Sequence, residues 1–181
     1  MIERRVHVIQ GEFQVTSDPN VVLTTILGSC VAACVRDPVA AVGGMNHFLL
    51  PGNDSSGKAS DPDAMRYGVH SMELLLNALY RYGARRERLE VKLFGGARMI
   101  DGLTDVGVQN ATFAERFMRG EGINVLGGSL RGDQGRRIQY WPVTGRVRQM
   151  AVASGDKSVF ETERRLPPPA PPAQTGAVEL F

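Results

Sequence analysis

The sequence predicts a layered sandwich of the α/β or α+β class, with mixed β-sheets, about two main helices and a disordered proline-rich tail at the C-terminus. Three observations support this class. Short β-branched and apolar runs occupy most of the first fifty positions, two later segments show apolar residues at helical spacing, and a hairpin pattern follows the second of them. Strands and helices in this order are typical of sheets with helices packed on them.

The predicted strands are runs of apolar and β-branched residues, which favour extended backbone. Turn residues such as Asp18-Pro19-Asn20 and Gly28-Ser29 separate them. The runs cover residues 5–9, 13–16, 21–27, 31–36, 42–50, 89–97 and 123–128. Residues 136–150 are predicted to form a hairpin around Thr144-Gly145.

The first helix is predicted within residues 65–84, after a polar stretch over 51–64 that is rich in Gly, Ser, Asp and Pro and reads as a mobile surface loop. The helix is expected to begin at His70 or Ser71 and to end at Gly83. Its apolar positions share helical spacing and are Met72, Leu75, Leu76 and Leu79.

The second helix is predicted over residues 110–122, with Asn110 as its N-cap and a glycine at 120 or 122 at its end. The composition changes after residue 160. Residues 166–181 hold five of the ten prolines, and proline-rich chain cannot build a core. We therefore expect one domain over residues 1–160 and a solvated tail over 161–181. Docking of the terminal Ala-Val-Glu-Leu-Phe on a partner is the alternative.

The composition limits the classes of function. A net charge of +2 is too weak to indicate a nucleic-acid binder. No apolar run approaches the roughly 20 residues that span a bilayer, and the N-terminus lacks the apolar core of a signal peptide. We therefore expect a cytoplasmic protein whose two cysteines are reduced. Cys30 and Cys34 have no histidine at ligand spacing, which argues against a structural zinc site.

The stretch LGSCVAACVRDPVAAVGGMNHFLLP, residues 27–51, brings a cysteine and a histidine together. If its two apolar halves form a hairpin over Asp37-Pro38-Val39-Ala40, Arg36 pairs with Ala41 and Cys30 lies directly across from His47. Directly opposed side chains have Cβ atoms about 5 Å apart. A bulge at Gly43-Gly44 would shift the register by one residue and place the pair on opposite faces.

This pair has the chemistry of a nucleophile and its base. An imidazole beside a thiol activates it, and backbone N–H groups at the Gly28-Ser29 turn can hold an oxyanion. A third group must orient the imidazole, and periodicity leaves Thr24 and Thr25 both open. The alternative is structural: a cysteine in an apolar strand is usually a small buried hydrophobe, which is the expectation for Cys34.

The motif from Leu23 to Pro51, with Thr-Thr-Ile-Leu-Gly-Ser-Cys-Val-Ala, Asp-Pro and Gly-Gly-Met-Asn-His-Phe-Leu-Leu-Pro, closely resembles the signature of the CheD family of chemoreceptor glutamine deamidases. Lys-Leu-Phe-Gly-Gly-Ala at 92–97, Gly107 to Asn110, Gly-Arg-Arg at 135–137 and Thr144-Gly145 are similar to later family motifs. The resemblance covers roughly residues 6–150. Ser-Leu-Arg-Gly at 129–132 departs from the family pattern, as do Arg146, Arg148 and Gln149.

The resemblance implies a CheD-like deamidase domain in which Cys30 is the nucleophile, His47 the acid and base, and Thr24 the residue that orients the imidazole. Gly28 and Ser29 would support the oxyanion. It implies no metal and no organic cofactor. The implied partners are the cytoplasmic domains of chemoreceptors and, in some members, a CheC-type phosphatase; nucleic acid and membrane insertion are not expected. The alternatives are a non-catalytic adaptor that binds these partners, and a cysteine protease or transglutaminase.

Overall fold

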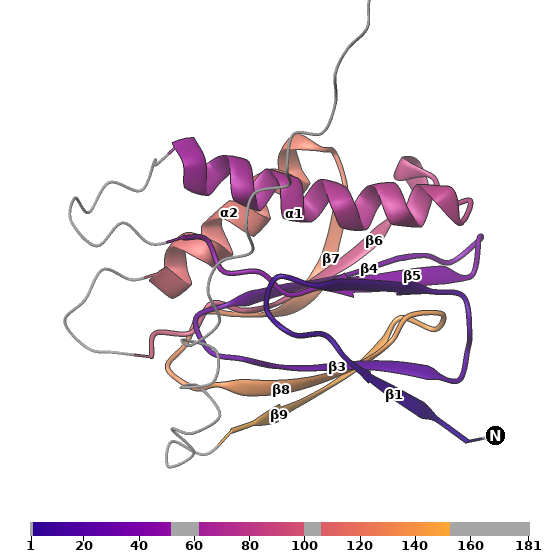
Figure 1. Ribbon diagram of the computed structural model, residues 1–181, viewed down its shortest axis with the longest axis horizontal. Helices are drawn as coiled ribbons and strands as arrows, with labels where there is room; N and C mark the ends of the chain where they lie inside the picture. The colour runs from indigo at the N-terminus through magenta and orange to yellow at the C-terminus, as the bar shows by residue number, and fades with distance from the viewer. Residues whose placement is uncertain (1, 52–61, 100–105, 153–181) are drawn as a thin grey trace, which may run out of the picture.

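The computed structural model describes residues 2–51, 62–99 and 106–152, which form three layers (Figure 1). Two helices cover one face of a five-stranded sheet, and a four-stranded sheet packs against its other face. Neither helix in the described part of the chain is long and apolar enough to cross a membrane.

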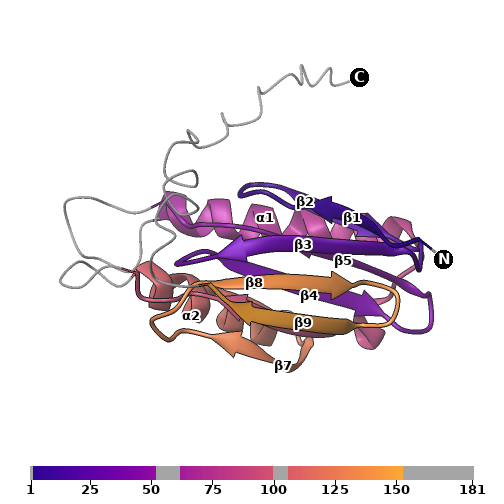
Figure 2. The same ribbon diagram turned by 90° about the horizontal axis from the view of Figure 1, so that it is seen from below.

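The four-stranded sheet is mixed and forms the outer layer (Figure 2). Its strands lie in the order β1, β3, β8, β9, and only the β1–β3 pair is parallel. Their bounds are β1 Arg4–His7, β3 Val21–Leu27, β8 Arg136–Trp141 and β9 Arg146–Ala151.

The five-stranded sheet lies in the middle, in the order β2, β5, β4, β6, β7, and only the β6–β7 pair is parallel. Its strands are β2 Phe13–Thr16, β4 Val31–Asp37, β5 Val42–Asn46, β6 Glu90–Gly95 and β7 Asn124–Leu130. The helices are α1 Pro62–Arg81, α2 Val106–Gly120 and the short 3-10 helix Arg86–Arg88.

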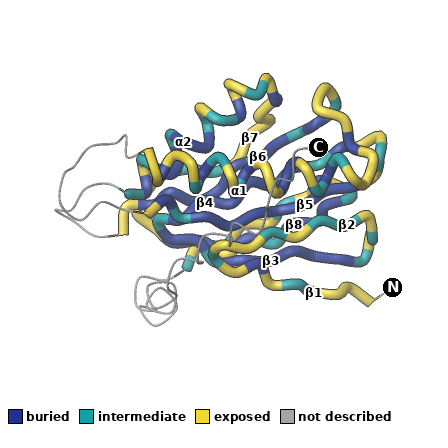
Figure 3. Tube along the Cα trace, turned by 45° about the horizontal axis from the view of Figure 1, so that its top comes forward, coloured by how far each residue is buried: buried dark blue, intermediate teal, exposed yellow. Residues whose placement is uncertain are grey.

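β4 is buried on both faces, because it lies in the middle of the sandwich (Figure 3). Val31, Ala33 and Val35 belong to the core beneath the helices. Ala32 and Cys34 belong to the core between the sheets. A strand whose two faces are both buried has apolar residues at successive positions rather than at alternate ones. This explains the continuous apolar sequence of β4.

The predicted class of fold is confirmed, with two mixed sheets and two main helices. The predicted hairpin around Thr144-Gly145 is also present, as β8 and β9. The expected strand over 42–50 is shorter, since β5 ends at Asn46 and Phe48 adds a single bridge to Val31. The proline-rich tail lies outside the described residues.

Both helices begin earlier than predicted. α1 begins at Pro62, so the end of the expected loop over 51–64 is helical, while 52–61 lie outside the described residues. Proline fits the first turn of a helix, where its missing N–H has no partner to lose. α2 begins at Val106, and Asn110 is a buried residue inside it rather than its N-cap. The side chain of Asn110 makes tertiary contacts to Leu50 and Ser29 instead of capping the helix.

The hairpin of β4 and β5 forms, but its turn lies one residue further along the chain than predicted. Asp37 pairs with Val42 and Arg36 with Gly43. The Asp37 carboxylate accepts hydrogen bonds from the N–H groups of Val39 and Ala40 at 2.9 and 3.0 Å, which closes the turn. Each residue of β4 therefore meets a partner two positions later than expected.

Candidate active site

Cys30 and His47 lie on the same face of the five-stranded sheet, toward the space between the sheets. The bridge between Val31 and Phe48 continues the hairpin register and puts Cys30 opposite Leu49. His47 is therefore a diagonal neighbour of Cys30, not its direct partner as predicted. A register change of two residues keeps every side chain on its face, so the two residues still share one side of the sheet. Both are buried.

The His47 imidazole is held by two oxygen atoms at Nδ1. Thr25 Oγ1 lies 2.9 Å away and the Val8 carbonyl oxygen 3.2 Å away. The Thr25 hydroxyl donates its own proton to the Val8 carbonyl at 2.8 Å, so its oxygen accepts from Nδ1. The neutral ring therefore carries its proton on Nδ1 and its lone pair on Nε2. An imidazole in this tautomer is prepared to accept a proton at Nε2.

Thr25, not Thr24, contacts the imidazole. Successive side chains of a strand point to opposite faces, so two adjacent threonines of β3 cannot both face His47. Thr25 shares its face with Leu23 and Leu27, which belong to the core between the sheets. The family resemblance pointed to Thr24, whereas the structure places the hydroxyl of Thr25 at the ring.

Burial keeps His47 neutral. Removal from water lowers the pKa of the imidazole to about 4, although the hydrogen bond to the Val8 carbonyl partly opposes this shift. The backbone of His47 is held as firmly as its ring. Its N–H donates to the Glu12 carbonyl at 3.0 Å and its carbonyl accepts from Gly11 N–H at 2.8 Å. His47 is therefore a fixed, uncharged base at neutral pH.

The Gly28-Ser29-Cys30 turn joins β3 to β4 and is held by its carbonyl groups. Ala97 N–H donates to the Gly28 carbonyl at 2.9 Å, and Gly96 N–H donates to the Cys30 carbonyl at 2.8 Å. Both hydrogen bonds are accepted by carbonyl groups of the turn, so the neighbouring segment holds the turn in its conformation. Gly96 and Ala97, which follow β6, thereby support the backbone around Cys30.

Asn110 connects this turn to α2. Its side-chain Nδ2 donates to the Ser29 carbonyl at 2.9 Å, and its Oδ1 accepts from Leu50 N–H at 3.0 Å. A fully buried amide with both ends bonded is a strong positional restraint. Sequence reasoning assigned Asn110 to a helix cap, because a cap and a buried bridge use the same residue type.

Two further side chains approach Cys30, and sequence reasoning missed both. Cys30 Sγ donates to Gln10 Oε1 at 3.4 Å, from the loop between β1 and β2. Tyr67 of α1 is half-buried; burial and the negative charge that Cys30 can carry both raise the pKa of its hydroxyl. Neither residue has a spacing signal, because each comes from a different part of the chain and only the fold brings it to the thiol.

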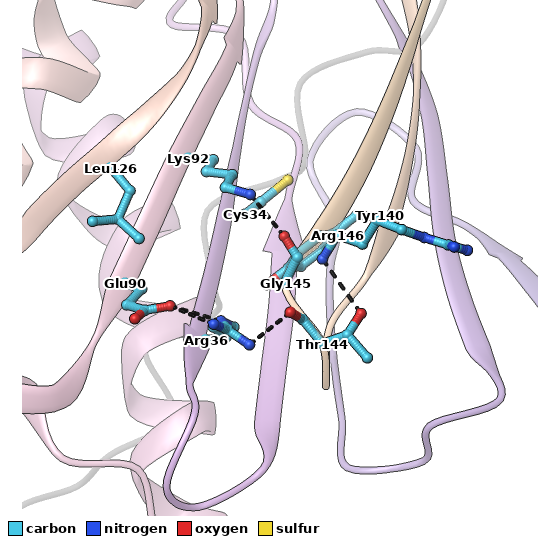
Figure 4. A pocket seen from close by; sticks show the side chains of 9 residues that line it. All are labelled: Cys34, Arg36, Glu90, Lys92, Leu126, Tyr140, Thr144, Gly145 and Arg146. Carbon is cyan, nitrogen blue, oxygen red and sulfur yellow. Dashed lines mark hydrogen bonds and ion pairs between the residues drawn. The ribbon is translucent and has the colours of Figure 1, made fainter.

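Cys34 faces the same intersheet space as Cys30 but lies further along β4, where it lines a separate polar cavity (Figure 4). Lys92 Nζ donates to the Gly145 carbonyl at 2.9 Å there, and Arg36 donates to the Thr144 carbonyl at 2.7 Å. Burial raises the pKa of the Cys34 thiol far above its ordinary value, more than Lys92 lowers it. Cys34 is buried, as the sequence predicted, and a thiol with a raised pKa is little ionised at neutral pH.

The family model and the curated relatives that match this chain agree on one family. Residues 49–151 match the family model described as CheD, CheD chemotactic sensory transduction. A "probable chemoreceptor glutamine deamidase CheD" of Caulobacter vibrioides is 57% identical over 177 residues, which cover 98% of this chain and 93% of the relative. Proteins of the same name are 57% identical in Acidiphilium cryptum, over 98% and 94% of the two chains, and 56% identical in Rhizobium etli, over 98% and 96%.

These alignments to relatives span Cys30 and His47, which precede the segment matched by the family model. Among solved structures, the Neisseria meningitidis protein NMB0706 superposes with a TM-score of 0.47 at 10% identity, covering 72% of this chain and 64% of the other.

Proposed function

Because the chain belongs to the CheD family, we propose that it is a protein-glutamine deamidase that converts glutamines of chemoreceptors to glutamate in chemotaxis. The observation that carries the proposed chemistry is the neutral His47 imidazole, held at Nδ1 by Thr25, on the same sheet face as the Cys30 thiol. A thiol with an oriented base beside it is the arrangement that acyl transfer through a thioester requires.

In the first half of the reaction, His47 Nε2 takes the thiol proton and Cys30 Sγ attacks the carbon of the substrate carboxamide. A bond forms between sulfur and carbon, and the carbonyl electron pair moves onto oxygen. N–H groups of the turn from Gly28 to Cys30 hold this oxyanion. As it collapses, the carbon–nitrogen bond breaks, and His47 gives its proton to the departing ammonia.

In the second half, water attacks the thioester carbon while His47 Nε2 accepts a proton from it. Collapse of this intermediate breaks the carbon–sulfur bond, releases glutamate and returns the proton to sulfur. One water is consumed and one ammonia is released for each glutamine. These steps use side chains and backbone of this chain together with water, and they need no cofactor.

Thr25 is the positioning residue of this proposal. Its oxygen accepts from Nδ1, and its hydroxyl proton is committed to the Val8 carbonyl. This chain of two hydrogen bonds fixes the ring's tautomer and orientation, as a carboxylate does in other triads. Thr24, which the family resemblance implied, has no such contact with the ring among the described residues.

The substrate partners are chemoreceptors, and we place the reaction on their cytoplasmic domains, so the enzyme works in the cytoplasm. A CheC-type phosphatase is the further partner that the family resemblance implied. We expect no binding of nucleic acid and no insertion into the membrane.

The direct test incubates the purified protein with the cytoplasmic fragment of a chemoreceptor and follows peptide masses. We expect a subset of glutamines to become glutamate with stoichiometric release of ammonia. A folded protein that binds the fragment but converts no glutamine would instead be the non-catalytic adaptor. Cleavage or crosslinking of the fragment would indicate a protease or a transglutaminase.

A further inference from the structure

The loop between β1 and β2 encloses the candidate catalytic pair. The Val8 carbonyl accepts from Thr25 and approaches His47 Nδ1, and the backbone of Gly11 and Glu12 pairs with the backbone of His47. Gln10 lies between these anchors. Its place relative to the imidazole is thus fixed from both sides by backbone contacts.

The Gln10 carboxamide reaches the nucleophile itself. Its Oε1 lies 3.4 Å from Cys30 Sγ, a hydrogen bond in which the thiol donates. The side chain is half-buried, so water only partly screens the contact. None of the steps above assigns this amide a role, although it touches a reacting atom.

We propose that Gln10 is a catalytic residue that stabilises negative charge, first on the Cys30 thiolate and then on the oxyanion of the substrate. This inference rests on the proposed deamidase function. A glutamine side chain ends in an acceptor, Oε1, and a donor, Nε2. A rotation of 180° about χ3 exchanges the positions of these two atoms. The group that accepts from the thiol can therefore donate Nε2–H once the proton has moved to His47.

Geometry supports a donor to the oxyanion over other roles. The substrate oxygen is bonded to the carbon that Sγ attacks, so a donor in contact with Sγ lies within reach of that oxygen. The electron balance is unchanged, because the amide only donates a hydrogen bond while sulfur attacks and ammonia leaves. Among the residues that the structure describes, the titratable side chains placed near the thiol are His47, on the same sheet face, and Tyr67 of α1.

The test compares Gln10→Ala and Gln10→Glu with Gln14→Ala, an exposed glutamine on β2 that serves as the matched control. Loss of one oxyanion donor lowers kcat by roughly a hundredfold to a thousandfold. We expect this range for Gln10→Ala, a larger loss for Gln10→Glu, whose carboxylate repels both charges, and no loss for Gln14→Ala.

The second readout is independent of deamidation. The rate of alkylation of Cys30 by iodoacetamide, followed by peptide mass as a function of pH, reports the thiolate directly. We expect its midpoint to move to higher pH in Gln10→Ala and further in Gln10→Glu. Thermal unfolding of each variant confirms that it is folded.

Unchanged kcat and unchanged alkylation profiles in folded Gln10 variants would overturn the inference. So would Cys30-dependent conversion of Gln10 to glutamate in the wild-type protein, because the amide would then be a substrate. If the wild type converts no receptor glutamine, the proposed function fails, and the alkylation profiles alone decide whether Gln10 acts on the thiol.

Discussion

At the scale of single residues, the site depends on which of two adjacent threonines faces the imidazole. The Thr25 hydroxyl accepts a hydrogen bond from His47 Nδ1 and donates a hydrogen bond to the Val8 carbonyl. A hydroxyl without a second acceptor could serve either as donor or as acceptor, and the ring tautomer would then be undefined. The carbonyl of Val8 removes this ambiguity and leaves the lone pair of the ring on Nε2.

Thr25→Val should lower kcat by between about tenfold and a hundredfold, because the ring loses the partner that orients it as an acid and base. Thr25→Ser, which keeps the hydroxyl, should restore most of the activity. Thr24→Val is the matched control and should leave kcat nearly unchanged. Nitrogen chemical shifts of His47 should show the Nδ1–H tautomer in the wild type and a mixture in Thr25→Val. Loss of activity in Thr24→Val alone would reverse the assignment.

At the scale of elements, the end of β6 supports the turn that carries Cys30 through close backbone contact. Gly95 has a φ of +107°, and a Cβ atom there would collide with the carbonyl of Cys30. No side chain other than hydrogen fits this approach. Gly95, the first glycine of the Phe-Gly-Gly-Ala segment, is therefore required by the contact between β6 and the Cys30 turn.

Gly95→Ala should lower the free energy of unfolding by about 2–4 kcal/mol through strain and overpacking, and should lower activity in the fraction that stays folded. Gly83 is the control, because it also has a positive φ but faces open space. Gly83→Ala should cost only about 1 kcal/mol. Urea denaturation measures both. Equal costs would show that the Cys30 carbonyl makes no close contact there.

Much of this arrangement was predictable from the hairpin alone, and one part was not. The period of two placed Cys30 and His47 on one face, and the Asp-Pro sequence placed the turn within one residue. The turn position itself depends on Ala41, which adopts a positive φ of 51°. A left-handed alanine has no sequence signal. Contacts from distant loops, such as Gln10 to Cys30, depend on the assembled sheets and are equally absent from local patterns.

At the scale of the whole molecule, the buried neutral histidine links stability to pH. His47 has a pKa of about 4 in the folded protein and about 6.5 in the unfolded chain. Between these values the unfolded chain binds more protons, so acid favours unfolding. The contribution of the neutral His47 to the free energy of unfolding is fully present above pH 6.5 and is progressively lost as the pH falls toward 4.

The free energy of unfolding of the wild type should therefore fall by about 2 kcal/mol between pH 7.5 and pH 5. His47→Gln should show a smaller change over the same range, since glutamine does not titrate. Asp37 does not contribute to the change between pH 7.5 and pH 5. Burial alone would raise the pKa of its carboxyl, but hydrogen bonds from Ala40, Arg85 and Arg88 lower it overall, so its contribution is lost only at more acidic pH. Equal pH dependence in the two proteins would show that His47 is not buried as a neutral ring.

The measurement that tests the central claim most directly is the conversion of receptor glutamines by two cysteine variants side by side. Cys30→Ala and Cys34→Ala each remove one buried thiol from the same strand region, and only the first removes the proposed nucleophile. Peptide masses of a receptor cytoplasmic fragment should show no glutamate formation with folded Cys30→Ala and nearly wild-type conversion with folded Cys34→Ala. Conversion by Cys30→Ala at the wild-type rate would contradict the account.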